Sequence, residues 1–198
     1  GSYQIEMPDS EKWDFDQTGL LESMSTFNGQ SVTITRDPSG TVLAATSTLG
    51  YSLLFGYNAA GRLASVTSVD KPSATAPVTR TVTYGYDTTK PLFPEGVLSS
   101  FTDVRSKTTL YENDDNGRVT KVTDPTGIVL AATIYDPTTG RVTSQMTPTG
   151  TVEFDYQTTQ TVTTLTSVTP HESITYHLDA MGRVDMMTDP LDITMMMS

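Results

Sequence analysis

The chain has 198 residues, a hydrophobic share of 36%, and 23 acidic against 12 basic side chains, which gives a formal net charge of -11. It is long enough to bury a sizeable core, its negative charge argues against nucleic acid as a partner, and no apolar run reaches the roughly 18 residues of a membrane span. Cysteine is absent, which excludes disulfides and thiolate chemistry.

The two ends of the chain suggest its organisation. Gly1-Ser2 resembles the scar of a cleaved tag, and we expect residues 1–12 to combine this scar with an N-terminal lead-in. We expect a single β-repeat module over residues 13–190. Residues 191–198 then begin a further strand or a truncated repeat, so the chain reads as a piece of a longer protein.

One phrase recurs along the chain: aromatic residues, an Asp or Asn, and then a Gly that is often followed by Arg. The Asp, Asn or Gln of each copy stands at position 16, 58, 87, 114, 136, 157 or 179, and the last four positions are separated by 22, 21 and 22 residues. Self-similarity at a fixed step is typical of repeat architectures. The residues to which we assign a structural role in the repeat are Tyr57, Asn58, Gly61, Arg62, Tyr84, Tyr86, Asp87, Tyr111, Asp114, Gly117, Arg118, Tyr135, Asp136, Gly140, Arg141, Tyr176, Asp179, Gly182 and Arg183.

Each repeat contains turn signals separated by alternating strands. Asp-x-x-Gly predicts a type I turn closed by a Gly with positive φ, and Asp124-Pro125-Thr126-Gly127 adds a Pro whose φ suits the second position. Between turns, apolar residues alternate with polar ones, as at Val152, Phe154 and Tyr156. We therefore predict an all-β fold, an antiparallel meander of repeated β-hairpins with little or no helix, whose recurring aromatic residues form ladders across adjacent hairpins.

These phrases resemble the YD repeats, also called RHS repeats, of toxin-complex shells, polymorphic toxins, wall-associated proteins and teneurin-like proteins. The resemblance rests on Tyr57-Asn58…Gly61-Arg62, Tyr135-Asp136…Gly140-Arg141 and Tyr176…Asp179…Gly182-Arg183, and it covers roughly residues 13–190. It implies a sheet of hairpins, which in long family members winds into a shell around a toxic segment. The family's self-cleaving C-terminal motif has no match in this chain.

Three groups of residues invite a chemical interpretation. The recurring arginines could bind an anionic ligand, but a position occupied in every unit favours packing on a neighbouring Tyr or pairing with a turn Asp. The stretch from Glu112 to Gly117, which contains Asp114 and Asp115, resembles the start of a calcium loop, although its twelfth position is Thr123 where such a loop needs a bidentate Glu. A Ca²⁺ ion at Asp114 and Asp115 is the single cofactor that we consider, and a plain turn is favoured over it.

His171 and His177 are the only histidines of the chain, and with Asp179 nearby they could form a metal site or a general base. A separation of six residues puts them roughly 20 Å apart on a strand, which argues against joint use. The methionines at 186–187 and 195–197 are interpreted as packing at the end of the sheet.

The repetition without a unique polar constellation predicts a non-catalytic module rather than an enzyme. We expect a secreted or cell-surface scaffold that adheres to a protein or a glycan, or that contacts other repeats of its parent chain. The alternative is a wall segment of a toxin-encapsulating shell. A hydrolase built on a β-scaffold is the third hypothesis.

Overall fold

The computed structural model describes the chain except for residues 71–77, 157–159, 167–171, 180, 182, 190 and 197–198, and it describes the backbone alone at residues 160–166, 172 and 173. The chain forms two compact units. Unit 1 contains residues 1–86 and 100–107, and unit 2 contains residues 87–99 and 108–198. One of the three points at which the chain passes between them, residues 99 and 100, lies in strand β9 (Val97–Thr102). The predicted limits at residues 12 and 190 stay predictions.

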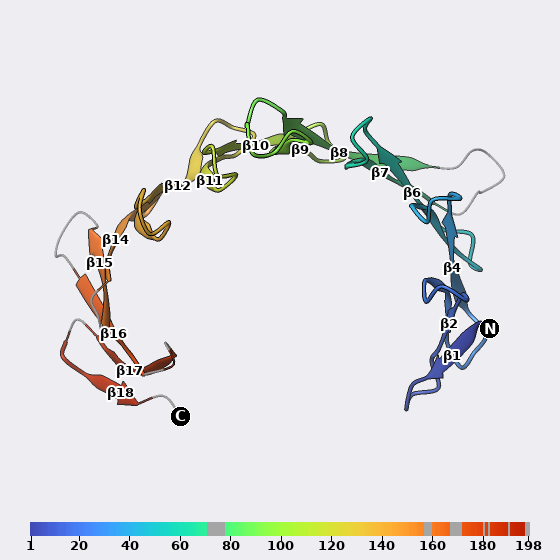
Figure 1. The fold of residues 1–198 in the computed structure, drawn as a ribbon, viewed down its shortest axis with the longest axis horizontal. Helices are drawn as coiled ribbons and strands as arrows, with labels where there is room; N and C mark the ends of the chain where they lie inside the picture. Colours follow the sequence, from blue (N-terminus) through green and yellow to red (C-terminus); the bar gives the residue numbers. More distant parts are fainter. Residues whose placement is uncertain are drawn as a thin grey trace. The chain divides into compact units, whose positions relative to one another are not determined.

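Unit 1 is a meander in which each strand pairs antiparallel with the next (Figure 1). Its strands are β1 (Tyr3–Glu6), β2 (Lys12–Phe15), β3 (Leu21–Ser25), β4 (Ser31–Arg36), β5 (Val42–Ser47), β6 (Ser52–Tyr57), β7 (Leu63–Val69) and β8 (Thr79–Asp87). The wider spacing of the repeat between positions 58 and 114 also predicts insertions near residues 71–77 and 90–96, and the first of these lies outside the described residues.

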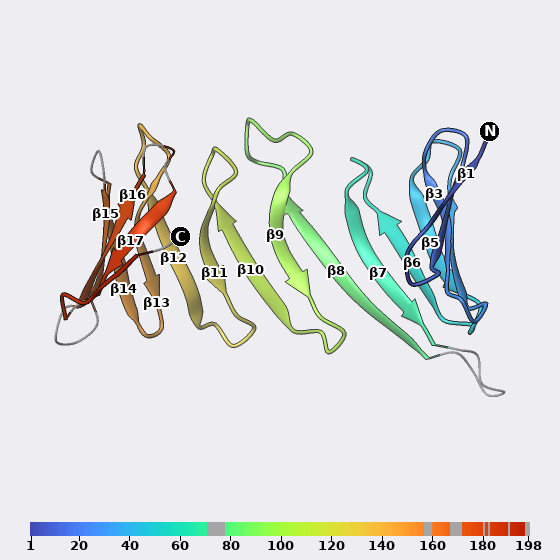
Figure 2. The same ribbon diagram turned by 90° about the horizontal axis from the view of Figure 1, so that it is seen from below.

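Unit 2 repeats this pattern, and Figure 2 shows its consecutive strands side by side. Its strands are β10 (Thr108–Asn113), β11 (Val119–Thr123), β12 (Val129–Tyr135), β13 (Val142–Thr147), β14 (Gly150–Tyr156), β15 (Gln160–Thr166), β16 (Glu172–Leu178), β17 (Val184–Thr188) and β18 (Thr194–Met196). The predicted all-β meander is confirmed. The described residues contain no helix, and hence none that could span a membrane.

The turns form because residues of Asp-x-x-Gly make hydrogen bonds with the backbone N–H and carbonyl groups of the turn itself. In the turn from Asp114 to Gly117, the Gly117 N–H donates to the Asp114 carbonyl at 3.0 Å, and the Asp114 N–H donates to the Arg118 carbonyl at 2.9 Å. Gly117 has a φ of 75°, which suits glycine. One Asp114 carboxylate oxygen also accepts the N–H groups of Asn116 and Arg118, at 3.0 and 2.9 Å. This turn chemistry recurs along the chain.

Seven of these turns are followed by a β-bulge. Glu112 pairs with Lys121 and Asn113 with Val119, so Thr120 is an extra residue on β11. The same reading of the register gives one extra residue after each of seven turns: Glu22, Leu43, Ala64, Thr120, Leu130, Thr143 and Asp185. A bulge puts two residues of one strand opposite one residue of its partner. It therefore decides which side chains meet at that end of the hairpin.

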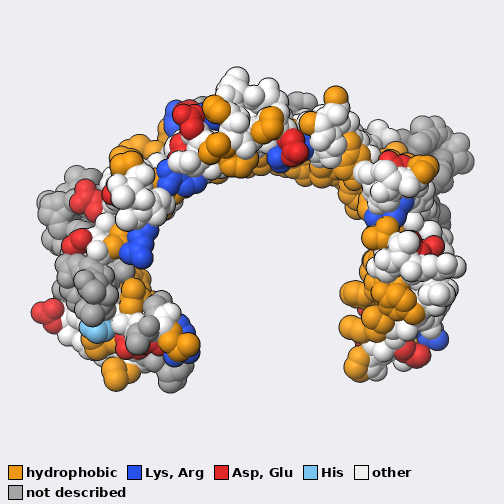
Figure 3. Space-filling model, viewed as in Figure 1, with side chains coloured by type: hydrophobic (Ala, Val, Ile, Leu, Met, Phe, Trp, Pro, Cys, Tyr) orange, Lys and Arg blue, Asp and Glu red, His pale blue; other side chains and the backbone are white. Residues whose placement is uncertain are grey.

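The described sheet is a single layer without a second layer to enclose a core. Val97, with 9% relative exposure, is the only hydrophobic side chain classed as buried in the described part of the chain. Cross-strand register puts Trp13 beside Met24, Met24 beside Val32, and Phe55 beside Val66 on one face of unit 1. Within each unit, Figure 3 shows hydrophobic side chains gathered along one side of the sheet. Neighbouring strands are thus the main source of burial.

Candidate functional site

The feature that recurs in both units is a contact between the arginine after one turn and the tyrosine before a later turn. The guanidinium carbon lies over the tyrosine ring, 5.6 Å from its centroid for Arg62 and Tyr86, and 4.3 Å for Arg118 and Tyr135. The third pair is Arg141 over Tyr156, at 5.0 Å. A cation over an aromatic face is attracted by the ring quadrupole. We call these three Arg–Tyr pairs the repeat fasteners.

The tyrosine hydroxyl adds a second link between repeats. Tyr57, Tyr86 and Tyr135 each donate from Oη to a backbone carbonyl, that of Val42, Leu63 and Val119 respectively, at 2.7, 2.7 and 2.9 Å. In each case the acceptor is the second residue after a turn glycine, Gly40, Gly61 and Gly117 respectively. The sequence did not reveal these hydrogen bonds, although the recurrence of Tyr and Gly in the repeated phrase is the signal from which they could be found.

Arg36 takes the tyrosine's place in an irregular repeat. It precedes the turn at Asp37, and its Nη2 donates to the Leu21 carbonyl at 3.4 Å, which is the equivalent acceptor after Gly19. Its Nη1 donates to the Gly40 carbonyl at 2.9 Å. An arginine at this position therefore links two repeats as a tyrosine does, because any long side chain that ends in a hydrogen-bond donor can reach the carbonyl.

The motif tyrosines do not stack on one another, which differs from the expected aromatic ladder. Among the described residues, ring contacts join Tyr3 with Phe15, Tyr84 with Phe101, and Phe154 with Tyr156, the last pair on one strand. Motif tyrosines of successive repeats, such as Tyr57 and Tyr86 or Tyr111 and Tyr135, lie two strand spacings or about 9.5 Å apart, which is too far for stacked rings. The longer arginine side chain spans adjacent strands instead.

Two of the arginines that follow a turn glycine also pair with the Asp that opens their own turn. Arg118 Nη2 lies 2.6 Å from Asp114 Oδ2, and Arg183 Nη2 lies 2.8 Å from Asp179 Oδ2. Burial opposes ionisation of Asp114, but the hydrogen bonds from Arg118 outweigh it and hold the pKa of this carboxyl below its usual value. At Asp179, the backbone N–H of Arg183 and then its side chain lower the pKa. These arginines therefore stabilise their own turns.

The remaining repeat positions have local partners. Tyr111 lies opposite Val122 in the register of β10 and β11, and Tyr176 lies opposite Met187 in that of β16 and β17. Asp87 Oδ1 accepts the N–H and the hydroxyl of Thr89, at 2.9 and 2.6 Å. Gly61 and Gly140 have positive φ in their turns, Asn58 and Asp136 open those turns, and Gly182 lies outside the described residues.

Replacing Arg118 by alanine is expected to cost more stability than replacing Arg141, because Arg118 combines its ring contact with the Asp114 ion pair. We expect a loss of about 1 to 2 kcal/mol for Arg118→Ala and about 0.5 to 1 kcal/mol for Arg141→Ala. Urea denaturation followed by circular dichroism measures both. Equal losses would show that the ion pair contributes nothing at this partly buried position.

The carboxylates proposed for calcium already face cations of the chain. Both Asp114 oxygens accept hydrogen bonds, from backbone N–H groups and from Arg118 Nε at 2.7 Å. Asp115 Oδ1 lies 3.6 Å from Lys90 Nζ. Calcium would have to displace both basic side chains. The described part of the chain contains no cluster of three or more His, Cys, Asp or Glu residues suited to a metal ion.

We therefore expect calcium to leave the thermal stability unchanged. About 5 mM CaCl₂ exceeds the dissociation constants of extracellular calcium modules, and an occupied site would raise the melting temperature by mass action. Differential scanning fluorimetry with MgCl₂ as the ionic-strength control measures the shift. A rise seen with calcium alone, and lost in Asp114→Asn, would establish the ion site.

The histidines are not brought together into a catalytic arrangement. His171 lies outside the described residues, and His177 lies on β16 opposite Met186 of β17. Asp179 is engaged in its turn, where Oδ1 accepts the N–H groups of Met181 and Arg183 at 2.8 and 2.9 Å. It is therefore not oriented as the partner of a general base.

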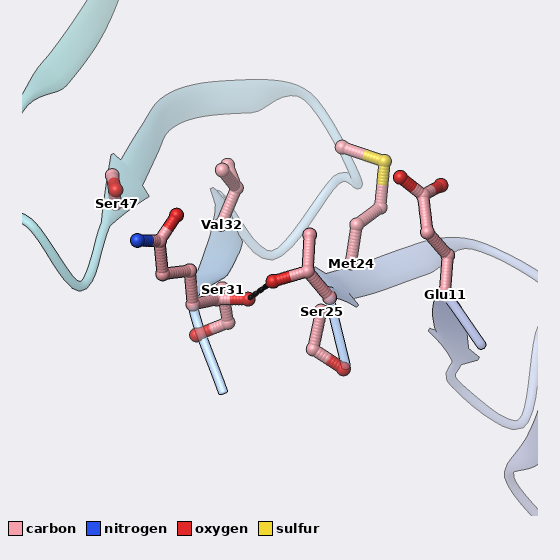
Figure 4. Close-up of a pocket in the computed structure, with 8 residues that line it drawn as sticks. Glu11, Met24, Ser25, Ser31, Val32 and Ser47 are labelled. Carbon is pink, nitrogen blue, oxygen red and sulfur yellow. Dashed lines mark hydrogen bonds between the residues drawn. The ribbon is translucent and has the colours of Figure 1, made fainter. Parts of the chain in front are cut away.

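Unit 1 carries a shallow hollow of about 250 Å³ over β3 and β4, shown in Figure 4. Met24 and Val32 supply its apolar lining, and Glu11 is the only ionisable residue among those that line it. One carboxylate without a base or an activated nucleophile beside it does not form a catalytic set. The hollow is a surface feature of the apolar face.

Solved structures share this fold. A crystal structure of TcdB2-TccC3 without its hypervariable C-terminal region matches with a TM-score of 0.57 and 16% identity; those of TcdB2-TccC3-TEV and TcdB2-TccC3-Cdc42 match with TM-scores of 0.56 and 0.54 and identities of 16% and 14%. Each match covers 94% of this chain and 12% of the other. No family model and no curated protein sequence matches the chain. The likeness supports an RHS-like repeat fold.

Proposed function

We propose that this chain is a non-catalytic scaffold and, more specifically, a segment of the wall of a larger repeat-built shell. The observation that carries the proposal is the recurrence of one fastener, an arginine over a tyrosine, at three places in a single-layer sheet. A side chain that serves every repeat holds neighbouring units together, whereas a ligand site usually occurs once.

The build of the sheet favours a wall over an independent globular domain. Its apolar side chains are half-buried between neighbouring strands, and large ones such as Tyr51 and Leu53 remain exposed, at 51% and 42%. A one-layer sheet of this kind gains burial when further chain covers one of its faces. The fold shared with much longer TcdB2-TccC3 chains is consistent with a role as one stretch of a longer wall.

The wall proposal differs from adhesion in what happens to the two faces of the sheet. A wall has one face closed off from solvent, while an adhesive sheet keeps both faces accessible until its ligand binds. Binding of a protein or glycan at a cell surface, and a secreted location, stay predictions. Contacts with other repeats or chains are the partners that the proposal requires.

Single-cysteine labelling tests the proposal, since the 198-residue chain contains no cysteine; any cysteine elsewhere in the full-length protein is first replaced by serine. Lys121 and Val122 are neighbours on β11 and point to opposite faces, so Lys121→Cys and Val122→Cys form a matched pair. In the 198-residue chain both cysteines should react with a membrane-impermeant maleimide. In the full-length protein, one of the two should react at least about tenfold more slowly because its face is enclosed. Equal rates there would overturn the wall proposal.

The enzyme hypothesis has its own test. His177→Ala and Asp179→Ala would be screened with the parent chain against a panel of glycan and peptide substrates. A scaffold shows no saturable turnover with any of them. Turnover that one of these variants abolishes while its melting temperature is unchanged would instead establish a catalytic site and end the scaffold proposal.

A further inference from the structure

Three residues capable of binding a soft metal lie in one cross-strand row near the end of unit 2. His177 of β16 pairs with Met186 of β17, and Met186 pairs with Met196 of β18. Directly opposite residues share a face of the sheet, with Cβ atoms about 4.5 to 5.5 Å apart. One imidazole and two thioethers are thus neighbours on three consecutive strands. The Met196 side chain is 83% exposed, so a metal ion can reach its sulfur.

A carboxylate lies beside the imidazole because of the β-bulge on β17. His177 pairs with Met186 and Leu178 with Val184, which leaves Asp185 as the extra residue opposite His177. His177 Nδ1 lies 3.6 Å from Asp185 Oδ1. This distance is too long for a hydrogen bond. Among the described residues, Asp185 Oδ1 is a buried oxygen with no hydrogen-bond partner.

This arrangement departs from that at two other bulges of unit 2. Thr120 and Thr143 are the equivalent extra residues, and their hydroxyls donate to the carbonyls of Glu112 and Ile134, at 3.1 and 3.3 Å. Those carbonyls belong to the residues that correspond to His177. An aspartate carboxylate cannot make that bond, because it has no proton to donate. At the last bulge, a threonine that donates a hydrogen bond to the facing carbonyl is thus replaced by Asp185, whose carboxylate is an acceptor that lies beside the His177 imidazole.

The first row of unit 2 has a different chemistry. In the corresponding places, Glu112 and Lys121 form an ion pair with 2.7 Å between Oε1 and Nζ, and Ala132 follows on β12. Because the equivalent row holds Glu112, Lys121 and Ala132, packing of the sheet does not by itself require a His and two Met residues at these positions. The row of His177 is thus a local specialisation of the repeat.

We propose that His177, Met186 and Met196 bind a copper(I) ion, with Asp185 as the acceptor that orients the imidazole. Thioethers are soft ligands that select Cu(I), whereas calcium and magnesium require oxygen ligands. A metal-binding histidine usually donates its second ring N–H to a carboxylate. Here Nδ1–H faces Asp185, which leaves Nε2 with its lone pair available for the metal. Methionine's three flexible torsions allow both sulfurs to approach the ion.

The opposite face of the same strands supplies a matched control. Met187 and Met195 are also cross-strand partners, but the next residue in their row is Tyr176, whose phenol does not replace an imidazole. This pair contains as many thioethers as the proposed site and lacks only the histidine and its carboxylate. A binding effect due to methionine content alone would appear equally at both pairs.

The experiment is an anaerobic titration of the 198-residue chain with Cu(I) buffered by a chromophoric chelator. One ion should bind per chain, and the variant Met186→Leu with Met196→Leu should bind at least about tenfold more weakly. The variant Met187→Leu with Met195→Leu should keep the parent affinity. Leucine preserves side-chain volume, and circular dichroism confirms that each variant is folded. X-ray absorption should show one nitrogen and two sulfur ligands.

Asp185→Ala tests the orienting role separately, with an expected weakening of about 10- to 100-fold in Cu(I) affinity and little change for Zn²⁺, which the site does not favour. Asp185→Asn keeps an oxygen acceptor and should recover much of the affinity. Failure of the parent chain to compete with the chelator would overturn the proposal. Equal losses in the two double-leucine variants would overturn it as well.

Discussion

Replacing Gly117 by alanine is expected to destabilise the protein by about 2 to 5 kcal/mol, the largest effect that we predict for a single methyl group. Gly117 has a φ of 75°, and an L-residue there costs about 1 to 2 kcal/mol. An added Cβ would also lie 2.6 Å from Cε2 and 2.7 Å from Cζ of Phe93. Displacing that ring adds about 1 to 3 kcal/mol of overpacking.

The contact is costly to disturb because Phe93 belongs to a loop that packs onto this turn. Residues 88–96 connect β8 to β9, and Lys90 of the loop lies 3.6 Å from Asp115 of the turn. Gly96 and Val97, at the end of the loop, are among the few buried residues of unit 2. An alanine at position 117 would push the ring out of this packing.

Gly127→Ala is the matched control. Gly127 has a φ of 90° in a turn of the same unit, and an added Cβ would meet no atom within 4 Å. It should therefore show the backbone cost alone, about 1 to 2 kcal/mol. In a Phe93→Ala background, the cost of Gly117→Ala should fall to that of Gly127→Ala. Urea denaturation of the four variants gives the coupling energy. An unchanged cost in the Phe93→Ala background would contradict the steric explanation.

Acid is expected to unfold the sheet through its turns. Eight turn aspartates have a pKa below the usual 3.8 because their carboxylates accept hydrogen bonds. The hydrogen bond from the Thr126 side chain makes the largest contribution at Asp124, and that from the Ser39 side chain does so at Asp37. Each carboxylate binds its proton more weakly in the folded state than in the unfolded state. The unfolded state thus takes up more protons as the pH falls.

The stabilisation is consequently complete well above pH 3.8 and is lost as the pH falls below 3.8, through the lowered folded-state pKa values. Melting temperatures measured from pH 6 to pH 2.5 should decline steeply at the acid end. A flat profile over this range would show that the turn hydrogen bonds to ionised carboxylates contribute no stability.

The chain itself indicates a variant that separates the charge of the turn from its geometry. Asn58 opens its turn with an amide, and its Oδ1 accepts the N–H groups of Ala60 and Arg62 at 3.0 and 2.9 Å. Asparagine therefore preserves the turn without titrating. Replacing four of the eight aspartates, at positions 16, 37, 124 and 136, should remove about half of the acid-induced fall in melting temperature if the sites are independent.

The reverse substitution, Asn58→Asp, should make the acid decline steeper, because it adds a carboxylate to an established set of donors. Both changes should leave the melting temperature near pH 7 close to that of the parent chain. An acid profile that the fourfold variant does not alter would assign the pH dependence to other carboxylates.

Local sequence was sufficient for the strands and turns. Asp114 and Gly117 are three residues apart, so the hydrogen bonds that define their turn depend on nothing outside it, and alternation along Val152, Phe154 and Tyr156 identifies a strand without knowledge of its partners. The position of arginine after four of the glycines likewise indicated contacts between repeats. The sequence did not indicate which residue each side chain contacts.

Those partners depend on register, which the bulges alter. The Tyr135 hydroxyl meets the carbonyl of Val119, 16 residues away, and Phe93 lies against Gly117, because pairing and loop packing bring distant segments together. The extra residue at each bulge, six or seven positions after the turn Asp, is not marked by any residue type. The sequence by itself thus determined an all-β meander and its turns, because these follow from hydrogen bonds and alternation within a few residues. Only the tertiary structure decided that Asp185 and Met186 both face His177, since that depends on a shift of one residue between two strands.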